Sequence, residues 1–166
     1  MSDFNLQTTM ELSDNEYNLI AQLIYELSGI CLGDNKKELV KARLMKRMRL
    51  HGFNKFKQYY NYVIRDSSGE ELEQLLNAIS TNVSHFLREK QHFAILAKQA
   101  IPDVLSKKKN NHLHIWSAAC ATGEEVYSIA LTMLEYCRIP EKIALKILGT
   151  DISTKALTYA RQAYYL

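Results

Sequence analysis

The sequence predicts a mixed fold, with an all-α helical bundle first and the start of an α/β, Rossmann-like domain after it. Apolar residues recur at helical spacing along most of the chain up to Ile79. Small residues then join a short strand from Leu113 to Ala118, predicted to be buried, to a helix whose broad apolar face includes Leu134. A second strand-like run, Ile143 to Gly149, precedes another helical pattern. Strands that alternate with helices indicate a parallel sheet.

Four short helices are predicted in the bundle, and each has a recognisable start or end. The first begins at a capping box, Ser13 to Glu16, and closes at Gly29. The second runs from about Lys36 to Leu50, the third follows Asn54 as its cap, and the fourth starts at Glu70. Short loops and apolar faces on all four helices place them around one core.

The chain divides into three segments on this basis. Residues 12–80 form the helical domain, and residues 112–166 form the partial α/β domain. Residues 81–111 form a connecting loop and one helix, which begins at Lys90 and ends near Ile101. The loop carries more amide and hydroxyl side chains than a simple linker needs, so we expect it to contribute to a site.

The turn after the first predicted strand suggests what kind of ligand binds there. The residues from Ala118 to Gly123 are small, so a ligand can approach the backbone closely. Glu124 and Glu125 in the first turn of the following helix would repel a pyrophosphate but suit hydroxyls or positive charge, as in S-adenosylmethionine. The alternative is that these carboxylates only complement the helix dipole, at ~0.3 to 1 kcal/mol each, and for Glu124 that alternative is preferred.

Asp151 lies at the carboxyl end of the second predicted strand. An acidic residue there would hydrogen-bond both hydroxyls of a ribose. The alternative role is the N-cap of the next helix, shared with Ser153. Because Ser153 already supplies a cap, ribose binding is the favoured interpretation of Asp151.

Positive charge is concentrated in and after the second helix. Between Lys36 and Lys57 there are nine basic residues against one acid, Glu38, a net charge of +8 in a chain of net charge +3. Such a face would steer nucleic acid, an anionic membrane or an acidic protein surface, unless it is simply solvated. Nucleic acid is disfavoured, because the aromatic residues expected for single-strand binding are nearly absent before Phe53.

The composition predicts a soluble cytoplasmic protein. There is no apolar run long enough to insert into a membrane and no basic, apolar signal segment at the N-terminus. The three cysteines have neither CxxC spacing nor disulfide density. His112 and His114 would share one face of a strand, but no third ligand is spaced to join them, so no metal site is expected.

Three motifs resemble the CheR-type chemotaxis receptor methyltransferases. They are STNVSHFLRE followed by HF, WSAACATGEEVYSIA from Trp116, and GTDIS from Gly149, and the basic helix contains the similar run RLMKRMR. The resemblance extends from Leu12 to Leu166. It implies that the second half begins a class I methyltransferase domain, and that a methyl group moves from S-adenosylmethionine to receptor glutamates, leaving S-adenosylhomocysteine.

The resemblance also implies the residues of the cofactor site. Arg88 would in addition orient a carboxylate at the reaction centre and so act in catalysis. Ser84 replaces the family's usual threonine and keeps the hydroxyl. The implied cofactor contacts are Asn82, Ser84, Arg88, Glu125 and Asp151.

The implied partner is the acidic helical cytoplasmic region of a chemotaxis receptor, bound by a monomer. The basic second helix would provide the docking face. The docking residues expected on it are Arg43, Lys46, Arg47 and Arg49.

The family's methyltransferase domain has further strands beyond the second, where this chain stops. We therefore expect either an N-terminal fragment of a longer protein or a truncated gene product, with doubtful activity by itself. The alternative function is a non-catalytic module that binds receptor or cofactor but has lost turnover.

Overall fold

The chain folds as two units, unit 1 (Met1–Ser80) and unit 2 (Thr81–Leu166). The computed structural model describes residues 10–107, 110, 112–135 and 144–165. Ile143, where the sequence predicts the second strand to begin, lies outside these residues. Each unit has its own apolar core and is described by itself.

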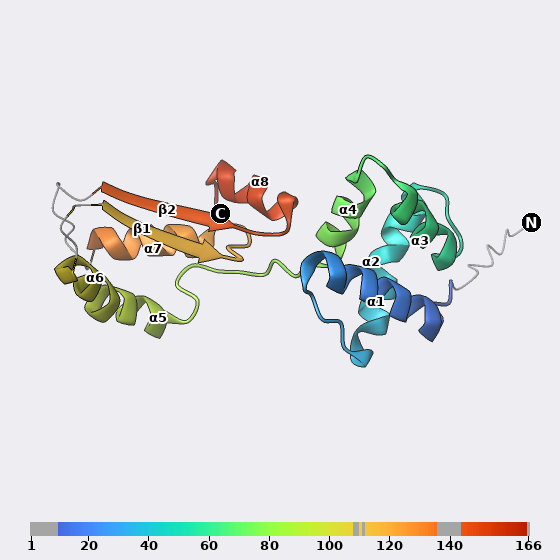
Figure 1. Cartoon of the computed structure of the whole chain (residues 1–166), viewed down its shortest axis with the longest axis horizontal. Helices are drawn as coiled ribbons and strands as arrows, with labels where there is room; N and C mark the ends of the chain where they lie inside the picture. Colours follow the sequence, from blue (N-terminus) through green and yellow to red (C-terminus); the bar gives the residue numbers. More distant parts are fainter. Residues whose placement is uncertain (1–9, 108–109, 111, 136–143, 166) are drawn as a thin grey trace, which may run out of the picture. The chain divides into compact units, whose positions relative to one another are not determined.

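Unit 1 is a bundle of helices, which confirms the predicted all-α domain (Figure 1). Apolar side chains from all the α-helices meet in one core, among them Tyr17, Ile24, Leu44, Tyr59 and Leu75. Packing their buried apolar side chains together supplies most of the stability of such short helices. The elements are α1 (Asp14–Ser28), η1 (Asp34–Lys36), α2 (Lys37–Leu50), α3 (Phe56–Arg65) and α4 (Glu70–Ile79).

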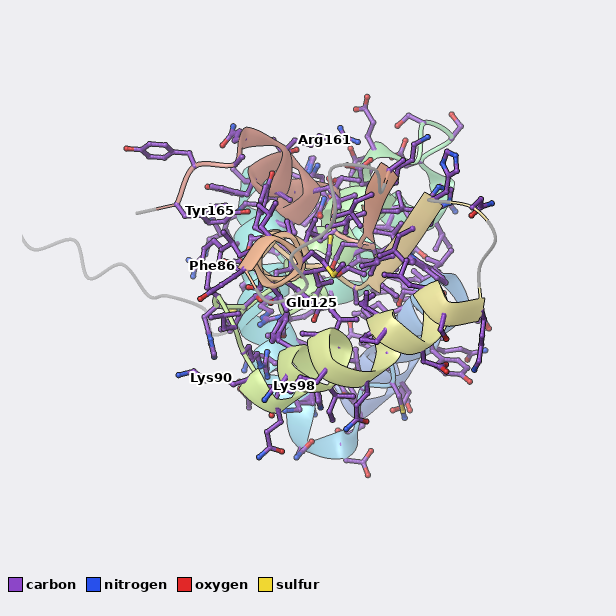
Figure 2. The ribbon with its side chains drawn as sticks, turned by 90° about the vertical axis from the view of Figure 1, so that its left-hand side faces the viewer. Phe86, Lys90, Lys98, Glu125, Arg161 and Tyr165 are labelled. Atoms are coloured by element: carbon purple, nitrogen blue, oxygen red, sulfur yellow. The ribbon has the colours of Figure 1, made fainter. Side chains whose placement is uncertain are left out.

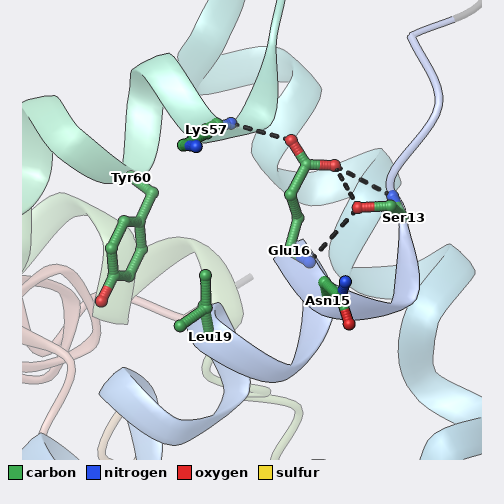
Figure 3. Close-up of a pocket in the computed structure, with 6 residues that line it drawn as sticks. All are labelled: Ser13, Asn15, Glu16, Leu19, Lys57 and Tyr60. Carbon is green, nitrogen blue, oxygen red and sulfur yellow. Dashed lines mark hydrogen bonds between the residues drawn. The ribbon is translucent and has the colours of Figure 1, made fainter.

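The capping box at the start of α1 is confirmed and has a second function. Ser13 Oγ accepts the Glu16 N–H at 3.3 Å, and the Glu16 carboxylate accepts the Ser13 N–H at 3.0 Å. The other carboxylate oxygen of Glu16 accepts the Lys57 N–H at 3.1 Å, in the first turn of α3 (Figure 3). The predicted Asn54 cap of α3 is wrong, because Lys55 is the N-cap residue and makes no side-chain cap bond. A side chain from another helix satisfies this N-terminus instead.

Glu71 is the one charged side chain buried in the described part of unit 1, at 4% exposure. Its carboxylate accepts hydrogen bonds from Arg47 Nε at 3.0 Å and from the Tyr59 hydroxyl at 2.6 Å, and His51 Nε2 lies 2.8 Å away. Burial by itself would raise the pKa of Glu71, but the bonds from Arg47 and Tyr59 hold that pKa below its ordinary value. The ionised carboxylate therefore ties α2, α3 and α4 together.

Unit 2 combines helices with a two-stranded parallel sheet. The helix predicted from Lys90 to Ile101 continues to Lys107 and contains a π-helical segment, η2. Described residues of unit 1 and unit 2 include no helix long and apolar enough to cross a membrane. The elements are α5 (Lys90–Ile95), η2 (Leu96–Ala100), α6 (Ile101–Lys107), β1 (His112–Ala118), α7 (Glu124–Glu135), β2 (Ala144–Thr150) and α8 (Thr154–Gln162).

β1 and β2 pair in parallel, from His112 opposite Ala144 to Ala118 opposite Thr150. This pairing confirms the predicted start of an α/β domain, and α7 lies along the sheet (Figure 1). Leu113 packs with residues of α7 in the core of unit 2.

The sequence predicts β1 to be buried, and this is wrong for every second residue. Trp116 of β1 is 68% exposed and Leu148 of β2 is 60% exposed. Successive side chains of a strand point to opposite faces, so Trp116 and Leu148 lie on the face that α7 does not cover. Leu134, which the sequence assigns to the apolar face of α7, is also exposed.

We predict that Glu71→Gln lowers the free energy of unfolding of unit 1 by about 3 kcal/mol, because it removes one charge of a buried ion pair. A larger loss is not expected, since Arg47 is partly exposed and water can solvate its charge. The folded-state pKa of Glu71 is lowered, so its contribution is complete above the ordinary pKa of 4.5 and is lost as the pH falls further. Urea titrations at neutral and acidic pH measure both effects.

The matched control is Glu70→Gln, which removes an exposed carboxylate from the same helical turn. It should cost less than about 1 kcal/mol. Equal losses in the two variants would contradict the assignment of Glu71 as the charge that joins the helices.

Candidate functional site

A cavity of about 660 Å³ lies in unit 2 beside the carboxyl ends of β1 and β2. This volume is within the range of small-molecule sites, ~300 to 1,000 Å³. Four of the five residues expected to contact the cofactor line it, namely Ser84, Arg88, Glu125 and Asp151. The fifth, Asn82, is half-buried between two lining residues but does not line the cavity itself.

The turn between β1 and α7 has an unusual backbone. Ala119 and Ala121 have φ angles of 63° and 48°, and Gly123 has a φ of 99°. Residues other than glycine rarely adopt positive φ, and such conformations persist only where surrounding contacts hold them. The turn is therefore fixed by its neighbours, and Ala119, Cys120 and Ala121 of the turn line the cavity.

Asp151 supplies one of these contacts. One carboxylate oxygen accepts the Ala121 N–H at 2.8 Å, and the other accepts the Ser153 N–H at 2.8 Å. Ser153 is confirmed as the cap of α8, since its hydroxyl accepts the Ala156 N–H at 3.1 Å. Asp151 thus has a structural role that the sequence does not reveal, in addition to the ligand role proposed for it.

The two glycines of this region allow close packing of the elements around the turn. A Cβ atom at Gly123 would lie 2.8 Å from the Cβ of Ala160 in α8. A Cβ atom at Gly149 would lie 2.8 Å from a methyl group of Val126 in α7. Both distances are far shorter than a normal contact, so only glycine lets α7 and α8 pack this closely against the strand ends.

The adjacent carboxylates Glu124 and Glu125 have different environments. Glu125 lines the cavity and accepts a hydrogen bond of 2.7 Å from the buried hydroxyl of Ser117. Glu124 does not line the cavity and accepts the Thr122 hydroxyl at 2.6 Å. This geometry supports a turn-stabilising role for Glu124, whereas Glu125 is oriented by a side chain of β1.

Arg88 lies in the segment before α5 and is exposed. One of its terminal nitrogens donates to the Val83 carbonyl at 3.2 Å. A guanidinium has five N–H donors, so this bond leaves most of its donors available for a ligand carboxylate.

The apolar walls of the cavity were not anticipated from the sequence. They come from α5 and η2, from β1 and from α7, and the helical spacing of Phe93 and Leu96 is the signal that would have indicated them. Buried Cys120 also lines the cavity, and its pKa is raised by burial and by the nearby carboxylates of Asp151 and Glu125. The wall residues are Phe93, Leu96, Ile115, Trp116 and Ile129.

These side chains fit S-adenosylmethionine by their chemistry. The carboxylates of Glu125 and Asp151 suit ribose hydroxyls and positive groups, and the guanidinium of Arg88 suits a carboxylate. Aromatic and aliphatic walls suit a purine ring. A phosphate would meet two carboxylates, so a nucleotide is a poorer match.

Two of the four predicted docking residues, Arg43 and Arg47, are engaged within unit 1. Arg43 donates to the carbonyls of Ile79 and Ser80, at the end of α4. Arg47 pairs with the carboxylate of Glu71, as described above. Both side chains thus connect α2 to α4, which limits what they can offer to a partner.

The other two docking residues, Lys46 and Arg49, are exposed on α2. Leu39 and Ala42 are exposed too, and the four residues follow the spacing of one helical stripe. The outer face of α2 is therefore mixed, with two apolar residues followed by two cations.

Comparison with known proteins identifies relatives of both units. Residues 15–80 match the family model described as the CheR methyltransferase all-alpha domain, and residues 82–166 match the CheR methyltransferase SAM binding domain. These matches confirm the resemblance inferred from the motifs. S-adenosylmethionine is thus the cofactor of the domain that unit 2 matches.

Individual relatives are similar along nearly all of this chain. A chemotaxis protein methyltransferase of Borreliella burgdorferi is 35% identical, over 98% of this chain and 58% of the relative. Those of Salmonella typhimurium and Escherichia coli are each 36% identical, over 94% of this chain and 52% of the relative. The chain spans 52% to 58% of the length of these relatives.

We predict opposite effects of exchanging Gly and Ala in the turn. Gly123→Ala should destabilise unit 2 by about 2 kcal/mol or more, because the new methyl group meets Ala160 and the φ angle is positive. Ala121→Gly should be neutral or stabilise unit 2, since it relieves strain at a φ of 48°. Denaturation followed by the fluorescence of Trp116, the single tryptophan, measures both. Equal destabilisation by the two exchanges would contradict this account of the turn.

Proposed function

Because the chain belongs to the CheR methyltransferase family, we propose that it binds S-adenosylmethionine in the cavity of unit 2 and takes part in methylating glutamate side chains of chemotaxis receptors. The observation that carries this proposal is the convergence of Arg88, Glu125 and Asp151 on one cavity with apolar walls. These residues come from three separate segments of the chain, so local sequence alone does not bring them together.

The expected chemistry makes modest demands on the protein. Bound S-adenosylmethionine supplies a methyl group already activated by its sulfonium, and a glutamate side chain is already an anion at neutral pH. The protein therefore has to orient the two reactants and exclude water. Arg88 is suited to hold a carboxylate, and Glu125 is suited to the positive groups of the cofactor.

Asp151 is suited to the ribose. Each of its carboxylate oxygens accepts one backbone N–H. A carboxylate oxygen has about two lone-pair sites, so each retains an acceptor for a ribose hydroxyl. The same side chain would thus bind the cofactor and hold the turn that approaches it.

The outer face of α2 is the proposed contact with the cytoplasmic region of a receptor, and the protein would accordingly act in the cytoplasm. The exposed cations Lys46 and Arg49 would attract an acidic helical surface, and Leu39 and Ala42 beside them would pack on it. Arg43 and Arg47 would act on this contact mainly by holding α2 in place.

We predict that Glu125→Ala and Asp151→Ala each weaken the binding of S-adenosylhomocysteine by ~1 to 3 kcal/mol, because each removes a hydrogen-bonding carboxylate from the cavity. Isothermal titration calorimetry measures the affinity. The matched control is Glu124→Ala, which removes the neighbouring carboxylate that does not line the cavity. Unchanged affinity in both cavity variants would reject the site.

We predict that Lys46→Glu with Arg49→Glu weakens association with an acidic receptor fragment and reduces its salt dependence, while the melting temperature stays the same. The same reversal at Arg43 and Arg47 should lower the melting temperature, because those side chains bond to α4. Sedimentation or calorimetry at two salt concentrations measures association. Normal binding by the Lys46 and Arg49 variant at low salt would exclude this face of α2 as the docking surface.

A further inference from the structure

The turn that carries Arg88 has a strained backbone on both sides of that residue. Leu87 has a φ of 52° and Glu89 has a φ of 58°. Neither residue is glycine, and neither is asparagine, aspartate or histidine, the other residue types that are enriched in the left-handed region. Strained conformations of this kind persist where surrounding contacts over-determine them, and they cluster at functional sites. The contacts that hold this turn therefore decide where the Arg88 guanidinium points.

One such contact comes from Ser128, in the middle of α7 and 0% exposed. Its hydroxyl donates to the Glu124 carbonyl at 2.6 Å, one helical turn earlier. The same oxygen accepts the Leu87 N–H at 2.9 Å. A serine inside a helix usually bonds only to its own helix, so the second bond is a specific link between α7 and the Arg88 turn.

A second contact holds the neighbouring residue of the turn. The rings of Phe86 and Tyr165 pack edge to face, with centroids 5.0 Å apart at 86° (Figure 2). The Tyr165 hydroxyl donates to the Thr122 carbonyl at 2.7 Å, in the turn after β1. The Tyr165 ring also packs on Tyr127 of α7, at 5.6 Å. Leu87 is thus bonded to α7, and Phe86 is joined through Tyr165 to the turn after β1. Residues of both elements line the cavity.

We propose that Ser128 is a positioning residue, which fixes the Leu87 backbone and thereby directs Arg88 toward the cofactor cavity. This inference rests on the proposed binding of S-adenosylmethionine in that cavity. Ser128 does not line the cavity, so it acts on the cofactor only through its neighbours, and its bond to the Leu87 N–H is its link to the turn that carries Arg88. This role requires the hydroxyl of Ser128, which accepts the Leu87 N–H. A residue of the same size without a hydroxyl would fill the same space but would not hold Leu87.

The chain offers a matched control for a buried hydroxyl in the same helix. Thr132 is 3% exposed, and its hydroxyl donates to the Ser128 carbonyl at 2.7 Å. Thr132→Val removes that hydroxyl and keeps the shape of the side chain. Ser128→Ala removes the other hydroxyl and introduces the residue most favourable to a helix, so α7 should remain folded. Only Ser128→Ala removes the acceptor of the Leu87 N–H, whereas Thr132→Val leaves that hydrogen bond in place.

The test is a double-mutant cycle in the full chain with S-adenosylhomocysteine as the probe, measured by calorimetry. Ser128→Ala should weaken binding about tenfold, and Thr132→Val by less than about twofold. In an Arg88→Ala background, Ser128→Ala should have almost no further effect, because the residue that it positions is gone. Unchanged affinity in Ser128→Ala, or a full tenfold loss in the Arg88→Ala background, would overturn the proposal.

A second measurement separates this proposal from the proposed function. Hydrogen exchange at the Leu87 amide requires no ligand, and Ser128→Ala should speed it at least about tenfold while Thr132→Val does not. If the parent chain does not bind S-adenosylhomocysteine, the proposed function fails, and faster exchange at Leu87 would still support the role of Ser128 in fixing the turn. Unchanged exchange at Leu87 would overturn that role whether or not the chain binds the probe.

Discussion

The parallel register of β1 and β2 is the constraint on which the site depends. Ala118 lies opposite Thr150, so both strands end at the same level. The Cys120 N–H continues the ladder by donating to the Thr150 carbonyl at 2.9 Å, and the next backbone N–H, that of Ala121, donates to Asp151. Because side chains alternate along a strand, a shift of one residue would turn Glu125's partner Ser117 to the opposite face. Register thus fixes which polar groups can meet a ligand.

The second feature of the site is that its polar groups are held before any ligand arrives. Glu125 is oriented by Ser117, Asp151 by two backbone N–H groups, and the turn that carries Arg88 by Ser128. Groups that are already ordered lose less entropy on binding, which favours affinity and correct orientation of the reactants. This arrangement requires glycine at positions 123 and 149, where elements pack closely. It also requires strained, positive φ angles in the turn that carries Arg88 and in the turn after β1.

Sequence reasoning succeeded where the determining contacts are local and failed where they come from another element. The capping box at Ser13 and the cap at Ser153 depend on neighbours along the chain, and both were predictable. The cap of α3 was not, because Glu16 supplies it from α1. For the same reason the bonds from Arg43 to α4 and the strained turns could not be predicted from periodicity, whereas the helical spacing of Phe93 and Leu96 could have indicated part of the cavity wall. The assignments of the cofactor residues and of the docking residues remain predictions, and the four side chains that share one cavity support the first of them.

The most direct test of the central claim is a titration with S-adenosylhomocysteine followed by the backbone amide resonances of the chain. The account predicts that the largest shifts cluster in Ser84 to Glu89, in Ala119 to Glu125 and at Asp151 to Ser153, with little change in α1 to α4. These segments are distant in sequence and meet around the cavity. Saturable shifts confined to unit 1, or no shifts at millimolar ligand, would contradict the claim that the strand ends of unit 2 bind the cofactor.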